Sequence, residues 1–179
     1  MSKEVTFRYL EAADCNPALL DSFNRYQRVK ESWRKVNEKW VLADTPFEEQ
    51  WDEKKKQYVI DDFKLCMENR DQIVGCFDDG KLIGWASVKK ELFGSAKQYA
   101  NLDYLHVSYE YRNRGLGKEL FRQAQNIARR FGAKKIYISS QSSKETQAFY
   151  KSVGCREAEE IDPVLYEKEP FDCHLEFVL

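Results

Sequence analysis

The chain has 179 residues, enough for one domain that buries about 70% of the surface its unfolded form exposes. Basic residues number 29 against 30 acidic ones, and 42% of residues are hydrophobic, which excludes a disordered chain and a nucleic-acid binder with a strongly basic face. No apolar run approaches the ~18 residues of a membrane-spanning helix, and the polar start at Met1-Ser2-Lys3-Glu4 shows no signal peptide. We therefore expect a soluble, cytoplasmic protein with neither nucleic acid nor membrane as a partner.

The cysteines and histidines give no metal-binding pattern. Five cysteines are scattered without C-x-x-C spacing, and the chain has only two histidines, His106 and His174. Dispersed cysteines in a cytoplasmic chain are typical of reduced, partly buried thiols. The sequence thus predicts no disulfide framework and no metal.

The first 70 residues favour a strand, helix and hairpin. Alternation of Val5, Phe7 and Tyr9 predicts a half-buried strand, and Asn16-Pro17 opens a helical stretch. Residues 32–42 favour a hairpin that turns at Asn37-Glu38, with a helix as the alternative. Residues 47–70 favour a helix that buries widely spaced apolar side chains: Trp51, Tyr58, Phe63 and Cys66.

The remainder alternates strands and helices, as expected for one α/β domain. A hairpin over 73–88 turns at an Asp-Gly pair, 89–100 is a loop or a strand extension, and 102–107 is a strand. A helix follows over 116–131, then a short strand at Ile136 and Ile138. A further helix is capped by the box Ser142-Ser143-Lys144-Glu145 and ends at Gly154.

The last residues, 173–179, alternate as a terminal strand after a polar connection through 163–170. The same alternation places His174 with Asp172 and Glu176 on a face expected to meet solvent.

A glycine loop between the strand at 102–107 and the helix at 116–131 is the most informative stretch. It reads Arg112-Asn113-Arg114-Gly115-Leu116-Gly117-Lys118. Free N–H groups at a helix start carry about half a positive charge, and glycine lets the backbone approach a ligand, so the loop predicts a phosphate site. A Walker loop needs Ser or Thr at Glu119, and a dinucleotide fingerprint needs glycine at Leu120, so both nucleotide patterns are excluded.

The loop resembles the acyl-CoA-binding signature [QR]-x-x-G-x-[GA] of the GNAT superfamily of N-acetyltransferases. The downstream stretch Ala148-Phe149-Tyr150-Lys151-Ser152-Val153-Gly154 is similar to the family's A-x-x-[FL]-Y-x-x-x-G-[FC] helix. The resemblance implies a single α/β (α+β) GNAT-like domain over 1–179, with a mixed central sheet of about six to seven strands flanked by helices. Residues 72–179 would form the acyl-CoA-binding core and 1–71 the acceptor-side half.

The resemblance also implies roles for individual residues. Backbone amides of the loop would wrap the coenzyme A pyrophosphate, and Tyr150 would protonate the departing thiolate. Ser143 stands where many members have an asparagine that contacts pantetheine, with a helix-capping role as the alternative. The residues expected to bind the coenzyme are Leu105, His106, Val107, Arg112, Asn113, Arg114, Gly115, Leu116, Gly117, Lys118, Ser143 and Phe149.

The strand at 102–107 would bind the thioester carbonyl through backbone amides, in an oxyanion-hole role. Asn101 occupies the position of the glutamate base of histone-type members, and an amide takes no proton at neutral pH. Asp103 is therefore favoured as the base or as an anchor for a cationic substrate, and His106 has a structural or pantetheine-adjacent role. Strand alternation places these two side chains on opposite faces unless a bulge intervenes.

The implied activity is acetyl transfer from acetyl-CoA, a co-substrate, to a primary amine of a small molecule or peptide by direct transfer, without a metal. Aromatic residues of the first half would offer walls for the acceptor, with core packing as the alternative for most of them: Trp33, Trp40, Trp51 and Tyr26. A mostly acidic-aromatic pocket would favour a cationic small molecule or peptide amine. Two alternatives remain open: a non-catalytic acyl-CoA-sensing module, and a protein acetyltransferase for lysines or N-termini. The protein is expected to be a monomer or homodimer.

Overall fold

The computed structural model describes residues 4–179, so the polar start at 1–3 lies outside the described residues. A mixed seven-stranded sheet has the order β1-β4-β5-β6-β7-β9-β8, and β2 and β3 form a separate two-stranded sheet. The strands are β1 (Thr6–Tyr9), β2 (Gln27–Val36), β3 (Lys39–Glu49), β4 (Gln72–Asp78), β5 (Lys81–Val88), β6 (Tyr99–Val107), β7 (Lys135–Ser140), β8 (Arg156–Glu157) and β9 (Cys173–Val178). The helices are α1 (Glu53–Glu68), α2 (Leu116–Arg130), α3 (Lys144–Ser152) and α4 (Pro163–Lys168), with 3₁₀ turns at Ala12–Asp14, Pro17–Leu20 and Tyr109–Tyr111.

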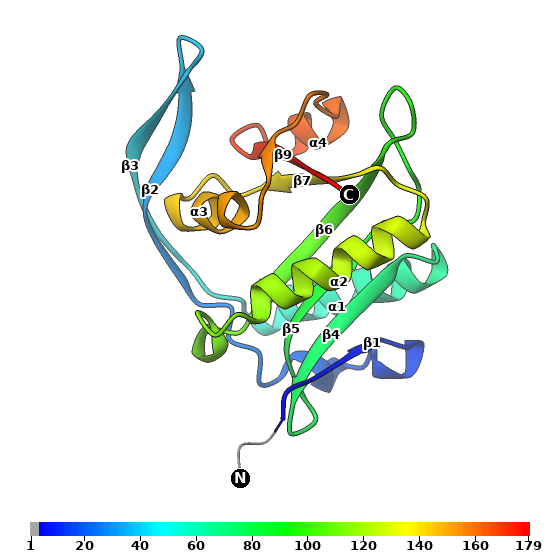
Figure 1. Ribbon diagram of the computed structural model, residues 1–179. Helices are drawn as coiled ribbons and strands as arrows, with labels where there is room; N and C mark the ends of the chain where they lie inside the picture. The colour runs from blue at the N-terminus through cyan, green and yellow to red at the C-terminus, as the bar shows by residue number, and fades with distance from the viewer. Residues whose placement is uncertain (1–3) are drawn as a thin grey trace.

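Helices cover both faces of the sheet, as expected for this pattern of strands and helices (Figure 1). The amphipathic α2 buries Leu120, Ala124 and Ile127 against one face. On the other face, α1 packs Phe63 and Ile60 into a second core, which also contains the rings of Phe23, Trp51 and Trp85. Two cores on opposite faces of one sheet give three layers. Within residues 4–179, no helix is long and apolar enough to cross a membrane.

Most expected elements form, including both hairpins. At the first hairpin's turn, Asn37 and Glu38 have φ of 48° and 62°, the left-handed pair that two-residue hairpin turns require. The helix expected over 47–70 begins only at Glu53, because Asp52 caps its N-terminus by accepting from Lys55 N–H at 2.8 Å. Residues 47–49 belong to β3 instead, and Trp51 precedes the helix.

The C-terminal third differs from expectation at two points. The cap of α3 is Ser143, which accepts from the Thr146 N–H, so the capping box predicted one residue earlier is wrong. The short helix α4 forms within the predicted polar connection, where Asp162 caps it and Pro163 opens it.

The face of β9 that carries His174 and Glu176 is buried, contrary to the predicted solvent exposure. The segment after β8 covers it: the Ala158 N–H donates to the His174 carbonyl at 3.0 Å, and the Tyr166 ring lies 5.7 Å from the imidazole. Alternation identified a polar face, but it could not show that a later segment folds over that face.

Glu176, on this covered face of β9, is fully buried, at 0% exposure. It accepts hydrogen bonds from the Tyr99 hydroxyl at 2.6 Å and from Arg156 Nε at 2.9 Å, and Lys135 Nζ lies 3.1 Å away. Burial alone would raise the pKa of Glu176, but these hydrogen bonds outweigh it and lower the pKa to about 2. The folded state therefore depends on the ionised form.

We expect Glu176→Gln to lower the free energy of unfolding by about 3 kcal/mol at pH 7, because Lys135 and Arg156 lose their buried partner. The folded pKa lies below the ordinary value of about 4.3, so the carboxylate's contribution is complete above about pH 5 and declines toward pH 2. Urea titrations should show a smaller difference from wild type at pH 3 than at pH 7. Glu159→Gln removes a 64% exposed partner of the same two cations and should cost under about 1 kcal/mol. Equal losses at both pH values would contradict the role of Glu176.

Candidate active site

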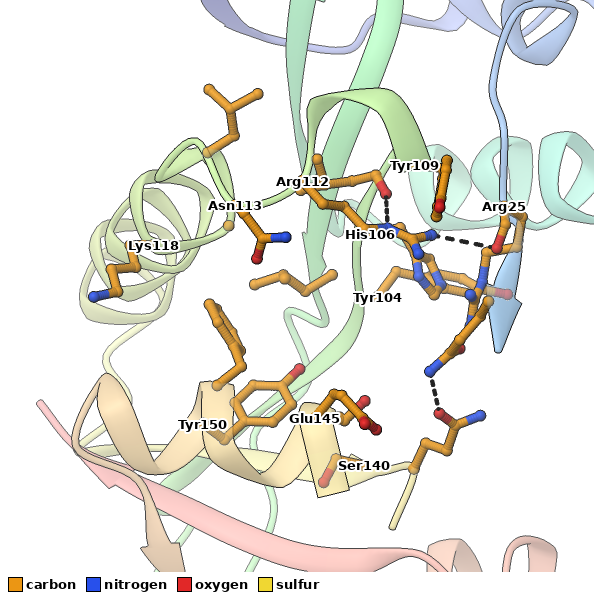
Figure 2. Close-up of a pocket in the computed structure, with 18 of the residues that line it drawn as sticks. Arg25, Tyr104, His106, Tyr109, Arg112, Asn113, Lys118, Ser140, Glu145 and Tyr150 are labelled. Carbon is orange, nitrogen blue, oxygen red and sulfur yellow. Dashed lines mark hydrogen bonds between the residues drawn. The ribbon is translucent and has the colours of Figure 1, made fainter. Parts of the chain in front are cut away.

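A cavity of about 1140 Å³ opens where β6 and β7 separate (Figure 2). These two strands pair in parallel only from Tyr99 to Asn101, opposite 135–137. Beyond that point residues 102–107 and 138–141 line opposite walls of the cavity, and α2 and α3 supply the remaining sides. The volume exceeds the roughly 300–1,000 Å³ of a typical single-ligand pocket, so two substrates have room.

One guanidinium holds together the segments around the cavity. Arg112 donates to the carbonyls of Val107 at 3.0 Å, Tyr26 at 2.7 Å and Arg25 at 3.3 Å. It therefore joins the end of β6 and the glycine loop to the segment that enters β2. Because it binds three carbonyls, this side chain has a structural role. The backbone N–H groups of the loop remain available to bind a ligand.

The N-terminus of α2 points into the cavity with its N–H groups available. Gly115, at φ 83°, occupies the cap position and offers no side-chain acceptor, and the first helical hydrogen bond runs from the Glu119 N–H to the Gly115 carbonyl at 3.1 Å. In the described chain, nothing accepts from the N–H groups of 116–118. A Cβ on Gly117 would lie only 3.2 Å from the Phe149 ring, so glycine is required for the close packing of α2 and α3.

Tyr150 projects from α3 into the middle of the cavity (Figure 2). Its ring packs edge-on against Phe149 and Phe121, at centroid distances of 5.1 and 6.3 Å, which fixes its direction. Burial, followed by the charges of Cys155 and Asp172, raises the pKa of the Tyr150 phenol, so the hydroxyl remains protonated at neutral pH.

A bulge in β6 decides where Asp103 and His106 lie. Ser87 pairs with Tyr104 and Val88 with Leu102, so Asp103 is the extra residue. The bulge places Asp103 and His106 on the same face, toward α1, instead of the opposite faces that simple alternation gives.

His106 lines the cavity within an aromatic cluster, with ring centroids 5.3 Å from Trp51 and from Trp85. Burial, and then the charges of Arg25, Arg112 and Lys55, hold the pKa of His106 well below 6.5. The imidazole is therefore neutral at pH 7 and has a nitrogen lone pair.

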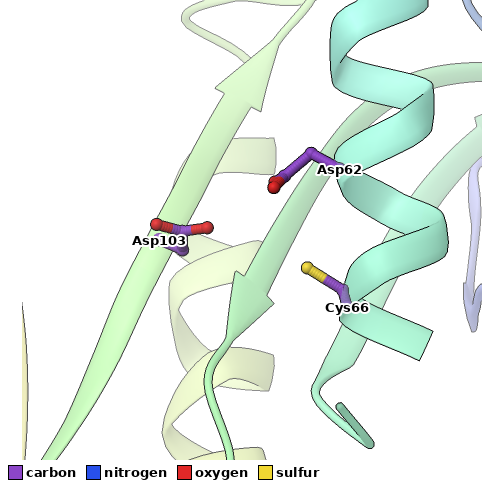
Figure 3. A group of neighbouring side chains, drawn as sticks. All are labelled: Asp62, Cys66 and Asp103. Carbon is purple, nitrogen blue, oxygen red and sulfur yellow. The ribbon is translucent and has the colours of Figure 1, made fainter. Parts of the chain in front are cut away.

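Asp103 is held in an ion pair beside α1. Its carboxylate lies with Asp62 and Cys66, and their ligand atoms are all within 4.8 Å of one another (Figure 3). Lys89 Nζ lies 3.3 Å from Asp103 Oδ2 and 3.4 Å from Cys66 Sγ, so a cation is already present. Burial raises the pKa of the Cys66 thiol to about 12, whereas metals bind the thiolate. The group fits an ion pair better than a metal site.

Most of the residues expected at the site reach this cavity. Those that line it are Asp103, Leu105, His106, Val107, Arg112, Asn113, Gly115, Leu116, Gly117, Lys118, Phe149 and Tyr150. Arg114 does not; its guanidinium lies 5.2 Å from the Tyr111 ring centroid. Ser143 does not either, because it is fully buried and its hydroxyl donates to Thr146 Oγ1 at 2.8 Å. Of its two predicted roles, only the helix cap is formed.

The cavity also contains residues that sequence patterns did not indicate. Gln27 Nε2 donates to Gln141 Oε1 at 2.8 Å, and the Trp33 N–H donates to the Ser142 carbonyl at 2.8 Å, so β2 closes one end of the cavity. The charged side chains that this first-half segment contributes are basic, Arg25 and Arg28, rather than the acidic ones that would favour a cationic amine. More than a hundred residues separate Gln27 from Gln141, and no local pattern marks such a contact.

Comparison with known proteins agrees with this arrangement. The model of the acetyltransferase (GNAT) family matches residues 36–155, more than half of the chain. The sequence has no significant match among curated proteins.

Solved structures share the fold at low sequence identity. One is a streptothricin acetyltransferase, as it is described, from Bacillus anthracis, solved with acetyl coenzyme A. It is 18% identical with a TM-score of 0.70, and the match covers 98% of this chain and 99% of that one. The PaiA N-acetyltransferase from Thermoplasma acidophilum, solved with coenzyme A, is 18% identical with a TM-score of 0.59 and the same coverage, 98% and 99%. A nourseothricin acetyltransferase is 14% identical with a TM-score of 0.68, covering 97% and 98%. With the family match established and the whole fold shared, the chain belongs to the GNAT family and is an acyltransferase.

Proposed function

We propose that this enzyme transfers the acetyl group of acetyl-CoA directly to a primary amine of a small molecule or peptide. The observation that carries the proposal is the cavity between the separating strands β6 and β7. The N-terminus of α2, with its unbonded N–H groups, lies at one end of this cavity, and the Tyr150 hydroxyl lies within it. Two related folds solved with acetyl coenzyme A or coenzyme A support this choice of donor.

The proposed coenzyme position follows from charge and hydrogen bonding. The pyrophosphate binds the N–H groups of 115–118, where the helix dipole favours negative charge, and Lys118 lies beside it. The pantetheine arm lies along 105–107, on the edge of β6 that has no strand partner beyond Asn101. A backbone N–H on this edge polarises the thioester carbonyl.

The proposed reaction balances without a further reactant. The neutral amine nitrogen attacks the thioester carbonyl, a C–N bond forms, the C–S bond breaks, and one proton passes from nitrogen to sulfur. His106 lines the cavity with a neutral imidazole, whereas the Asp103 carboxylate is bound to Lys89. Because its lowered pKa makes this imidazole a weak base, it accepts the proton as the C–N bond forms, when the nitrogen becomes cationic and acidic. Tyr150 donates to the leaving sulfur, and solvent returns the borrowed protons. Holding both substrates in one cavity supplies up to roughly 7–11 kcal/mol of the barrier reduction.

The donor assignment is tested with Gly117→Glu. A carboxylate at the start of α2 would meet the pyrophosphate, and the side chain would clash with Phe149, so acetyl-CoA binding by calorimetry should be lost. Asn126→Glu adds the same charge near the other end of α2 and should leave the affinity unchanged. In parallel, wild type should release coenzyme A only when an amine is present. Tight acetyl-CoA binding without turnover of any amine would favour the sensing module instead.

We expect Tyr150→Phe to lower kcat by about 10²-fold and to change acetyl-CoA affinity less than 3-fold, because the phenol acts on the leaving thiolate. Tyr111→Phe is the control, because the Tyr111 hydroxyl is bound to Asp78 at 2.7 Å. Steady-state kinetics and calorimetry measure the two effects separately. An unchanged kcat would show that Tyr150 serves only to pack α3.

The proton acceptor is tested by comparing two positions on the same face of β6. His106→Ala should lower kcat/KM by about 10²-fold, and added imidazole should restore part of the rate. Asp103→Asn should lower the thermal midpoint, because Lys89 loses a partner, and should leave kcat/KM within about 3-fold. The reverse pattern, with Asp103→Asn the slower enzyme and no rescue by imidazole, would move the role to Asp103.

A further inference from the structure

The end of the cavity opposite α2 contains an arginine with unused hydrogen-bonding capacity. Arg25 lies in the segment before β2, lines the cavity, and has a side chain only 11% exposed (Figure 2). One contact neutralises it in part, from Arg25 Nη2 to Glu49 Oε2 at 3.1 Å, and Glu49 is itself 36% exposed. Its Nε is buried and has no hydrogen-bond partner in the described chain. A guanidinium held in this way can still bind a planar anion.

A second buried guanidinium increases the positive charge at this end. Arg112 is bonded to three carbonyls, which satisfy its N–H groups without cancelling its charge. The Glu110 carboxylate acts on Arg112 by charge but forms no ion pair with it, and it accepts from Asn24 Nδ2 and, at 3.2 Å, from the Ser108 hydroxyl. Buried cations that are only partly compensated are costly, so this end of the cavity favours a ligand that brings negative charge.

Apart from Glu49, no carboxylate forms an ion pair with these two arginines in the described chain. Glu48 lies 3.8 Å from Arg28 with both side chains more than half exposed, an arrangement that water screens. Asp103 is bound to Lys89 on the far side of the β6 bulge. The neutral His106 of β6 lines the same cavity and adds no positive charge to the pair of arginines.

Aromatic side chains form the remaining walls of this end. The rings of Tyr26 and Tyr109 meet edge-on at 5.3 Å, and the Arg25 guanidinium lies 5.7 Å from the Trp51 ring centroid. Aromatic walls accept an apolar or aromatic side group, and stacking on Trp51 fixes the plane of the guanidinium. The site thus offers one fixed cation beside an apolar surface.

From this combination we infer that the acceptor amine also carries a carboxylate, which Arg25 binds through its guanidinium, so that the substrate class is amino acids or related amino carboxylates with an apolar side group. The inference rests on the proposed acetyl transfer and specifies the acceptor for the same cavity. An amine bearing no anion would leave Arg25 with Glu49 as its one ionic partner and Arg112 with none in direct contact.

Matched acceptors test the inference. L-phenylalanine, its primary amide and phenethylamine share the ring and the amine, and only the first carries a carboxylate. The amide has the most readily deprotonated amine of the three, so any preference for the acid must come from the carboxylate. We expect kcat/KM for the acid to exceed both others by at least ~10-fold, the size of one charged hydrogen bond.

Variants assign that preference to Arg25. Arg25→Gln should raise KM for the acid by at least ~10-fold and bring it level with the amide, with acetyl-CoA affinity unchanged by calorimetry. Arg25→Lys keeps the positive charge but lacks the planar guanidinium with its paired donors, so it should retain part of the preference. A partial preference in this variant would show that the loss in Arg25→Gln is not caused by misfolding. Lys30→Gln removes one exposed positive charge from β2, the strand that follows Arg25, and should keep the full preference.

The outcomes separate this inference from the proposed function. Acetylation of the amide or of phenethylamine at a rate equal to or above that of the acid, unaffected by Arg25→Gln, would overturn the carboxylate inference and leave acetyl transfer intact. Binding of acetyl-CoA without acetylation of any of the three acceptors, or of a wider set of amino acids, would overturn the inference and count against the proposed transfer as well.

Discussion

The structure depends on the way two neighbouring parallel strands part. β6 and β7 share only three residue pairs, and each keeps its other partner, β5 and β9, after they separate. Their facing edges are therefore held open by the rest of the sheet. Backbone groups on such an edge need a partner from water or a ligand. The bulge at Asp103 lies just after Asn101, where β6 separates from β7, and it changes which face the following side chains of β6 occupy. The cavity therefore opens next to the same bulge that decides which β6 side chains face it.

The two halves of the chain meet across this opening through a small set of contacts. Arg112 binds carbonyls of the segment before β2, and the Asn24 N–H donates to the Ser108 hydroxyl at 2.9 Å. At the other wall, β2 is bonded to 141–142. These contacts join segments more than eighty residues apart and make the first half a wall of the cavity formed by the second. The two ends of the cavity are thus connected, because Arg112 of the glycine loop also binds the Arg25 carbonyl.

Charge is distributed very unevenly for a chain whose net charge is −1. The cavity's acceptor end has arginines with little compensation, whereas a cluster beneath the sheet gathers Asp62, Asp71 and Asp103 around Lys89. Burial alone would lower the pKa of Lys89, but Asp103 and the other neighbours outweigh it and raise the pKa, so Lys89 stays charged among these carboxylates. In the cavity, the N-terminus of α2 beside Lys118 and the arginines at the opposite end face a ligand's charge. Composition averages over both regions and cannot reveal either.

The sequence by itself determined the elements and the donor loop. Local patterns specify these: alternation for the strands, an apolar stripe for α2, an Asp-Gly turn for the hairpin over 73–88, and glycines where Gly115 takes φ 83°. Three features depended on the tertiary structure: the bulge that moves Asp103 to the face of His106, the segment that covers Glu176, and the placing of Arg25 at the acceptor end. Each of these depends on contacts between residues far apart in the chain, and burial and charge pairing exist only after such contacts form.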